Sequence, residues 1–61
     1  MKPYHEMTEE ERLEFGREVA NDPTSHGFMR QGRPITNVEM NAYTLWMRDQ
    51  RRKANELLRD L

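Results

Sequence analysis

The fold of this chain is decided by residues 36–61, which read TNVEMNAYTLWMRDQRRKANELLRDL. No Pro or Gly interrupts this stretch, which permits a helix of about 24 residues, roughly 36 Å long at 1.5 Å rise per residue. Its start is marked by Thr36 and Glu39, which have the spacing of a capping box. The sequence therefore predicts a helix over residues 37–60.

Apolar side chains recur along this predicted helix at alternating spacings of three and four residues. Such a heptad-like seam is typical of a helix that packs against another helix. One member, Gln50, is polar, and a polar residue in a seam more often fixes register or oligomer state than binds a ligand. The predicted seam consists of Met40, Tyr43, Met47, Gln50, Ala54, Leu57, Leu58 and Leu61.

A second capping box, Thr8 with Glu11, precedes a shorter helix that we predict over residues 9–21. Pro23 ends this helix because it disfavours helical geometry in the residue before it. Gly16 lies in the middle of the helix, where glycine costs about 1 kcal/mol relative to alanine. We expect Gly16 to permit the close approach of a neighbouring helix.

The remaining segments show no helical periodicity. Residues 1–8 read as a loose N-terminus, and residues 22–36 as a long loop rich in Thr, Ser, Gly and Pro. Phe28 and Met29 lie in this loop, and we expect them to fold back onto the helices around one short helical turn. The predicted fold is all-α, with residues 1–61 forming a single domain, an antiparallel two-helix hairpin with a long connecting loop.

The composition favours self-association. A chain of 61 residues without cysteine has no disulfide or thiolate metal site, and its 34% apolar residues supply only a marginal core. Because the first helix is about half as long as the second, Leu57, Leu58 and Leu61 would have no partner within the chain. We therefore expect a homodimer or larger assembly through the second helix.

Charge is divided between the two predicted helices. Residues 9–18 are acidic, and the middle of the second helix is basic through Arg48, Arg51, Arg52 and Lys53. A net charge of −1 argues against a dedicated binder of the phosphate backbone. We expect the basic residues mainly to pair with the first helix, with about 0–1 kcal/mol from each exposed pair.

The residue types that catalysis and metal binding require do not converge in this sequence. His5 and His26 lie far apart without a second ligand at a useful spacing, and the run Glu9-Glu10-Glu11 is typical of a solvated first helical turn. No Gly-rich phosphate loop, apolar membrane-spanning run or signal peptide is present. We expect a non-enzymatic cytoplasmic protein without catalytic residues, cofactor, metal or membrane partner.

Residues 40–53 resemble the first helix of an HMG box, in which a Met-Asn-Ala-aromatic stretch precedes a Trp and a basic run. The resemblance implies a minor-groove contact by Asn41 and a DNA wedge at the position of Thr44, although the family uses an apolar wedge. An Arg-Pro pair directly precedes this stretch in the family and lies further upstream here, as Arg33-Pro34. The DNA contacts that the resemblance implies are Asn41, Arg48, Arg51, Arg52 and Lys53.

The chain has a second likeness, which rests on its small size, helical character, high charge and lack of cysteine. In these features the chain is similar to the short accessory proteins encoded in the early regions of temperate lambdoid bacteriophages, which implies a modulator of a host or phage protein. Our leading hypothesis is a regulatory or accessory protein that acts by protein–protein interaction. The alternative hypothesis is a DNA-binding module that uses residues 40–53.

Overall fold

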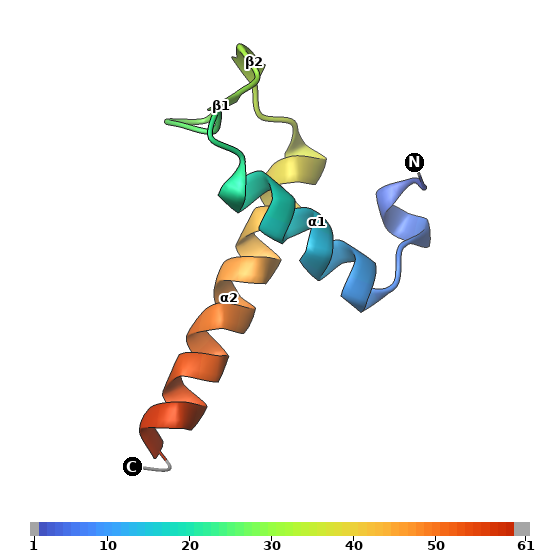
Figure 1. Cartoon of the computed structure of the whole chain (residues 1–61). Coiled ribbons are helices and arrows are strands. Elements are labelled where there is room, and N and C mark those ends of the chain that lie inside the picture. The colour runs from blue at the N-terminus through green and yellow to red at the C-terminus, as the bar shows by residue number, and fades with distance from the viewer. Residues whose placement is uncertain (1, 60–61) are drawn as a thin grey trace.

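The computed structural model describes residues 2–59, which form two packed helices and a small two-stranded sheet (Figure 1). In chain order the elements are the 3-10 turn η1 (Tyr4–Glu6), α1 (Glu9–Asn21), β1 (Met29–Arg30), β2 (Arg33–Pro34) and α2 (Asn37–Arg59). The predicted pair of packed helices is confirmed and the chain is mostly helical, but the connection between the helices contains a small sheet that the all-α prediction lacked. Residues 60 and 61, which the sequence assigned to the helix end and the seam, lie outside the described residues.

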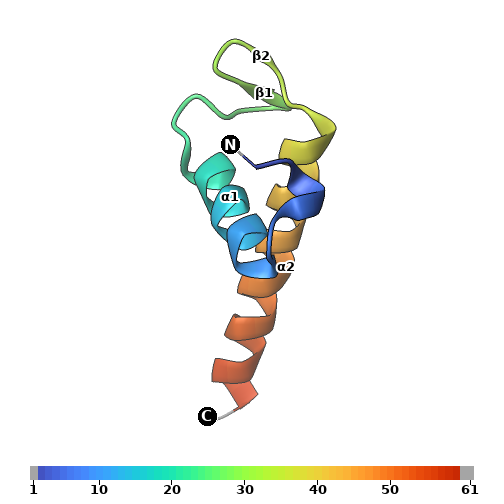
Figure 2. The same cartoon turned by 90° about the vertical axis from the view of Figure 1, so that its right-hand side faces the viewer.

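The two helices run in roughly opposite directions, and α1 crosses only the first part of α2 (Figures 1 and 2). The second part of α2 projects beyond this crossing, and every residue from 50 to 59 is exposed. The core lies at the crossing, where Phe15, Val19 and Ala42 are buried. Leu57 and Leu58 are exposed as predicted, and no other part of residues 2–59 covers them.

Both helices begin with the capping boxes that the sequence predicts. At the start of α1 the Glu11 amide donates to Thr8 Oγ1 at 3.1 Å, and the Thr8 amide donates to Glu11 Oε1 at 3.0 Å. At the start of α2 the Glu39 amide donates to Thr36 Oγ1 at 3.2 Å, and the Thr36 amide donates to Glu39 Oε1 at 3.0 Å. Each box satisfies two amides that the first helical turn leaves without a partner.

Gly16 forms the closest approach of the two helices. A Cβ atom at this position would lie 2.1 Å from the carbonyl oxygen of Ala42 and 2.7 Å from the Cβ of Trp46. A hydrogen atom is therefore the only side chain that fits between the two backbones. The expected role of Gly16 in close helix packing is confirmed.

The N-terminal segment is more ordered than the predicted loose lead-in. Tyr4 and Met7 pack against the core, and η1 lies beside the helical pair (Figure 2). Arg12 holds this segment: its Nε donates to the Tyr4 carbonyl at 3.2 Å, and its guanidinium lies 4.7 Å from the centroid of the Tyr4 ring. One cation on α1 thus supplies both a hydrogen bond and a cation–π contact.

The connection begins with a tight turn in place of the helical turn expected around Phe28 and Met29. His26 and Met29 exchange backbone hydrogen bonds of 2.9 and 2.8 Å. The two residues between them, Gly27 and Phe28, have positive φ angles of 47° and 68°. Two consecutive positive φ angles are typical of a type I′ hairpin turn, and Phe28 is 75% exposed in this turn.

A second turn of the same kind joins the two strands. Arg30 pairs with Arg33 in antiparallel register, and the intervening Gln31 and Gly32 have φ angles of 54° and 74°. The Gln31 amide donates to Thr24 Oγ1 at 2.9 Å, which fixes the tip of this turn to the start of the connection. The sequence alone predicted a loop here because neither turn has the Asn-Gly or Asp-Gly pair that best signals a hairpin.

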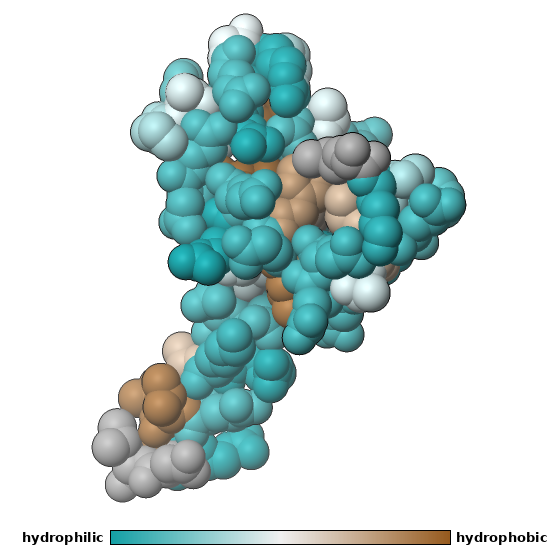
Figure 3. Space-filling view, turned by 45° about the vertical axis from the view of Figure 1, so that its right-hand side comes forward, coloured by the Kyte–Doolittle hydropathy of each residue, from teal (hydrophilic) through white to brown (hydrophobic). Residues whose placement is uncertain are grey.

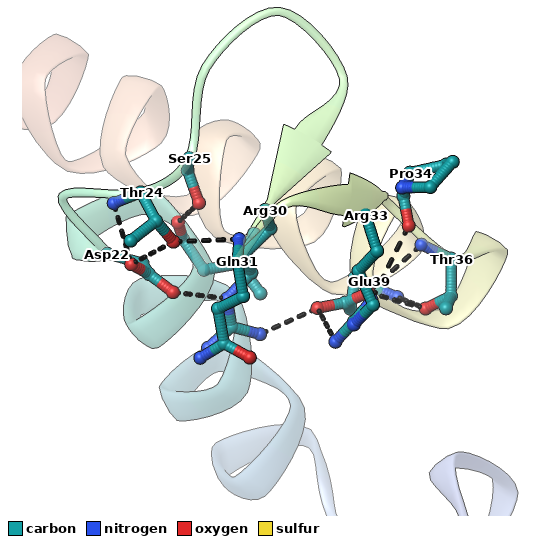
Figure 4. A network of polar contacts seen from close by, with 10 residues as sticks. Asp22, Thr24, Ser25, Arg30, Gln31, Arg33, Pro34, Thr36 and Glu39 are labelled. Atoms are coloured by element: carbon teal, nitrogen blue, oxygen red, sulfur yellow. Dashed lines mark hydrogen bonds and ion pairs between the residues drawn. The ribbon is translucent and has the colours of Figure 1, made fainter.

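A buried carboxylate ties the sheet to the start of α2. Glu39 is only 4% exposed, yet both of its oxygens accept hydrogen bonds (Figure 4). Arg33 donates to them at 2.8 and 3.3 Å, Arg30 at 2.7 Å, and the Thr36 hydroxyl at 2.9 Å. A buried charge is tolerated where it is paired and hydrogen-bonded in this way.

Arg30 extends the same network to the end of α1. Its Nε donates to Asp22 Oδ2 at 2.6 Å, while its Nη1 reaches Glu39, so that one guanidinium lies between the two carboxylates (Figure 4). Asp22 also accepts hydrogen bonds from the amide and the hydroxyl of Thr24, at 2.8 and 2.7 Å. The C-terminus of α1, the sheet and the N-terminus of α2 are therefore joined by a single polar network.

These contacts stabilise the ionised form of both carboxyl groups. Hydrogen bonds from Thr24 and Arg30 lower the pKa of Asp22 from its ordinary value of 3.8 to about 2. Hydrogen bonds from Arg33, Thr36 and Arg30 outweigh the desolvation of Glu39 and hold its pKa far below the ordinary value of 4.5. Both oxygens of each carboxylate therefore accept hydrogen bonds from within the chain.

Candidate interaction surface on the second helix

The predicted seam of α2 faces mostly away from α1, although Gln50 also borders the cleft between the two helices. Tyr43 and Met47 are 36% and 44% exposed, Gln50 and Ala54 are exposed, and Met40 is half-buried. Leu57 and Leu58 are 70% and 68% exposed, and apolar surface gathers near the free end of α2 (Figure 3). We call these residues the outer seam: Met40, Tyr43, Met47, Gln50, Ala54, Leu57 and Leu58.

A different stripe of α2 packs against α1. Ala42 is fully buried, and Trp46 and Asp49 are half-buried. At 3.6 residues per turn, this stripe lies roughly a third of a turn around the helix from the outer seam. The rotation of α2 follows from the contact of small Ala42 with Gly16 and from the network at Glu39, and both leave the outer seam without a partner among the described residues.

The size and shape of the molecule agree with an uncovered surface. A monomer of 7.4 kDa typically exposes about 4,200 Å², whereas this chain exposes 4998 Å². Its radius of gyration is 13.0 Å, compared with about 10.5 Å for a compact chain of this length. The surplus of roughly 800 Å² goes with this extended shape, in which the second part of α2 projects from the core.

One end of the outer seam opens into an apolar groove. The groove has a volume of about 310 Å³ and lies where the first turn of the connection meets the two helices. Its apolar lining includes Val19, Phe28, Ile35, Met40 and Tyr43. Phe28 contributes a bulky side chain from a left-handed backbone conformation, which is uncommon for an aromatic residue and is found most often where function demands it.

The predicted nucleic-acid contacts are divided between two sides of α2. Arg48, Arg51 and Arg52 line a shallow groove together with Asn55, Glu56 and Arg59. This set, in which four arginines outnumber one glutamate, forms a basic stripe next to the outer seam. Asn41 is exposed one heptad before Arg48, on the same side of the helix. Lys53 lies instead beside Glu10, Glu14 and Trp46, in the cleft between α1 and α2. The structure therefore separates Lys53 from Asn41, Arg48 and Arg51, while Arg52 and Lys53 both contact Asp49.

Arg52 and Lys53 form ion pairs within α2 itself, and the expected pairing of the basic residues with acidic α1 is wrong. Arg52 contacts Asp49 at 2.7 Å and Glu56 at 2.9 Å, and Lys53 contacts Asp49 at 3.1 Å. These contacts lower the pKa of Asp49. Partners three or four residues away on one helix are closer than the solvated side chains across the cleft. Within residues 2–59, Arg48 and Arg51 form no ion pair with an acidic residue.

Among residues 2–59, no group of three or more His, Cys, Asp and Glu side chains is arranged to hold a metal ion. His26 belongs to the first turn of the connection and borders the apolar groove, whereas His5 lies in η1. In the same part of the chain, no helix combines the length and the apolar character that crossing a membrane requires.

Sequence reasoning identified the members of the outer seam but missed the groove at its end. Phe28 and Ile35 come from the connection, and only the two turns bring them next to Tyr43. The available signal was the pair of glycines, Gly27 and Gly32, each within a stretch that could close a two-residue turn. Compared with known proteins, this chain matches no family model, no curated protein and no solved structure.

Proposed function

We propose that this protein is a small non-enzymatic accessory protein that acts by binding another protein through the outer seam of α2. The observation that carries the proposal is a row of apolar side chains along α2, next to the different stripe of that helix that is already packed against α1. Met47, Leu57 and Leu58 are large and exposed, and exposed apolar rows of this kind mark protein interaction sites.

The perturbed carboxyl groups support binding in preference to catalysis. A catalytic acid or base needs a free position from which to exchange a proton with a substrate. Glu39 and Asp22 instead have their acceptor oxygens occupied by Arg30, Arg33 and Thr24. The low pKa values of Glu39 and Asp22 follow from these hydrogen bonds, which join α1, the sheet and α2.

A photo-crosslinking residue in place of Met47 tests this proposal in the cells that naturally carry the chain. Met47 lies in the middle of the outer seam, and we expect it to yield covalent adducts with protein. The matched control carries the same residue in place of Glu18, which is exposed on α1 away from the outer seam, and should yield none. Absence of protein adducts at position 47, or equal adducts at both positions, would overturn the proposal.

The basic stripe favours DNA binding as a second candidate function. Arg48 and Arg51 are exposed without ion-pair partners among the described residues, and Asn41 extends the stripe toward the start of α2. Against this candidate, the net charge of −1 gives little general attraction to phosphates. We expect binding to duplex DNA to be weak, near the roughly 10⁻⁴–10⁻⁶ M of non-specific contacts.

Titration of bent and straight duplexes at two salt concentrations separates the two candidates. Submicromolar binding at physiological salt that prefers bent DNA would establish the DNA-binding candidate. In that case Arg51→Gln should weaken binding and lower its salt dependence. Lys53→Gln, which removes the same charge from the cleft side of α2, is the matched control and should leave binding unchanged.

A further inference from the structure

The outer seam has a complementary pair of features at its two ends. At one end, Tyr43 and Met40 open into the apolar groove that is also lined by Phe28. At the other end, Leu57 and Leu58 project from a part of α2 that contacts no other element. The chain therefore carries both an apolar hollow and an apolar projection on the same side of one helix.

The spacing of these features allows two copies of the chain to fill each other. Tyr43 and Leu57 are separated by 14 residues, or about 21 Å of helix, and Gln50 lies halfway between them. A two-fold axis at Gln50, perpendicular to α2, would place Leu57 of each copy opposite Tyr43 of the other. Such an isologous arrangement uses one surface twice and closes on itself.

The residues between the two ends fit the same arrangement. Next to the axis, large Met47 would lie within one residue, about 1.5 Å along the helix, of the small Ala54 of the other copy, which permits close packing of the helices. On the axis, the two Gln50 amides would face each other, and each can donate and accept a hydrogen bond. Gln50, the only polar member of the outer seam, would then hydrogen-bond to Gln50 of the other copy and fix the register of the two helices.

We propose that the partner of the outer seam is a second copy of this chain, packed antiparallel so that Leu57 and Leu58 of each copy enter the groove beside Tyr43 of the other. This proposal rests on the proposed function, because it names the occupant of the same surface. Each groove is incomplete without the partner's leucines.

Sedimentation equilibrium measures the assembly directly. The wild-type chain should sediment at twice its mass of 7.4 kDa at micromolar concentration. Leu57→Glu should raise the dimer dissociation constant by about 100-fold, because two symmetry-related leucines lose their burial. Asn55→Glu adds the same charge on the adjoining stripe and is the matched control, for which the dimer should persist.

Engineered cysteines determine the orientation, since the natural chain has none. We expect an equimolar mixture of Tyr43→Cys and Leu57→Cys chains to form mainly the mixed disulfide, which mass spectrometry distinguishes from the two homodisulfides. Met47→Cys mixed with Ala54→Cys gives a second, independent pair at exposed positions and should behave alike. A disulfide needs Cβ atoms about 3.5–4.5 Å apart, so only neighbours across the interface can form it.

The outcomes separate this proposal from the proposed function. Homodisulfides alone would show a parallel dimer and overturn the antiparallel arrangement. A monomer at every concentration, with photo-crosslinks from position 47 to a different protein, would overturn the second copy as partner and leave the proposed function standing. A monomer that yields no protein adduct at position 47 would remove both.

Discussion

Replacement of Gly16 by alanine tests the packing of the two helices at its closest point. The added Cβ would lie 2.1 Å from the Ala42 carbonyl oxygen, about 1.3 Å inside the 3.4 Å at which ordinary van der Waals contact begins. The obstacle is backbone, which cannot rotate away as a flexible side chain can. The helices must therefore separate, and this loosens the core around Phe15 and Val19.

Two opposing terms decide the size of the effect. Alanine is favoured over glycine in a helix interior by about 1 kcal/mol, and overpacking of a core costs about 1–3 kcal/mol or more. Because the clash is with backbone and more than 1 Å deep, as the 2.1 Å distance shows, we expect the upper end of that range. The expected result for Gly16→Ala is a net loss of about 2 kcal/mol, or a fall in melting temperature of about 8–16 °C for a domain of this size.

Thermal and urea unfolding, followed by circular dichroism, measure this loss. Position 18 is exposed on the same helix, so the difference between Glu18→Ala and Glu18→Gly gives the helix propensity alone and should favour alanine. Relative to glycine, alanine should lower stability at position 16 and raise it at position 18. If Gly16→Ala left stability unchanged or raised it, the close crossing at Gly16 would be refuted.

Three further changes probe the polar contacts of the fold. Glu39→Gln should lower stability by about 3 kcal/mol in urea unfolding. This is the low end for a broken buried ion pair, because Arg33 is half exposed. If Glu39→Gln lost no more stability than the control Glu14→Gln, a structural role of Glu39 would be contradicted. Thr36→Ala should cost about 1 kcal/mol, and more than Thr8→Ala, because the Thr36 hydroxyl also donates to Glu39; equal losses would contradict that added contact. In an acid titration, the free energy of unfolding should stay constant above about pH 4.5 and fall toward pH 2. The reason is that folding lowers the pKa of Glu39 and Asp22, so that the unfolded chain takes up protons first as the pH falls. Glu39→Gln should make this fall less steep.

The sequence was sufficient for features that depend on neighbours in the chain. The two capping boxes fixed the starts of both helices, because a cap involves residues three positions apart. Gly16 was recognisable as a close-packing site because its cost in a helix requires a compensating contact. The members of the outer seam were recognisable from their heptad spacing, which needs no knowledge of the partner.

The connection shows why local patterns gave only part of the fold. Gln31 and Phe28 adopt left-handed conformations that their residue types disfavour, and tertiary contacts such as the Gln31 hydrogen bond to Thr24 hold them there. The ion pairs of α2 also departed from expectation. Arg52 and Lys53 found Asp49 one turn away on their own helix, where the distance is set by helix geometry and not by the approach of α1.

By itself, the sequence determined that two helices form, where they begin, and which residues make an apolar seam. Only the tertiary structure decided that this seam faces outward. The rotation of α2 is set by the fit of Ala42 against Gly16 and by the burial of Glu39 between Arg30 and Arg33. Both contacts join residues far apart in the chain, and a pattern of spacing along one helix carries no information about which side another helix will cover.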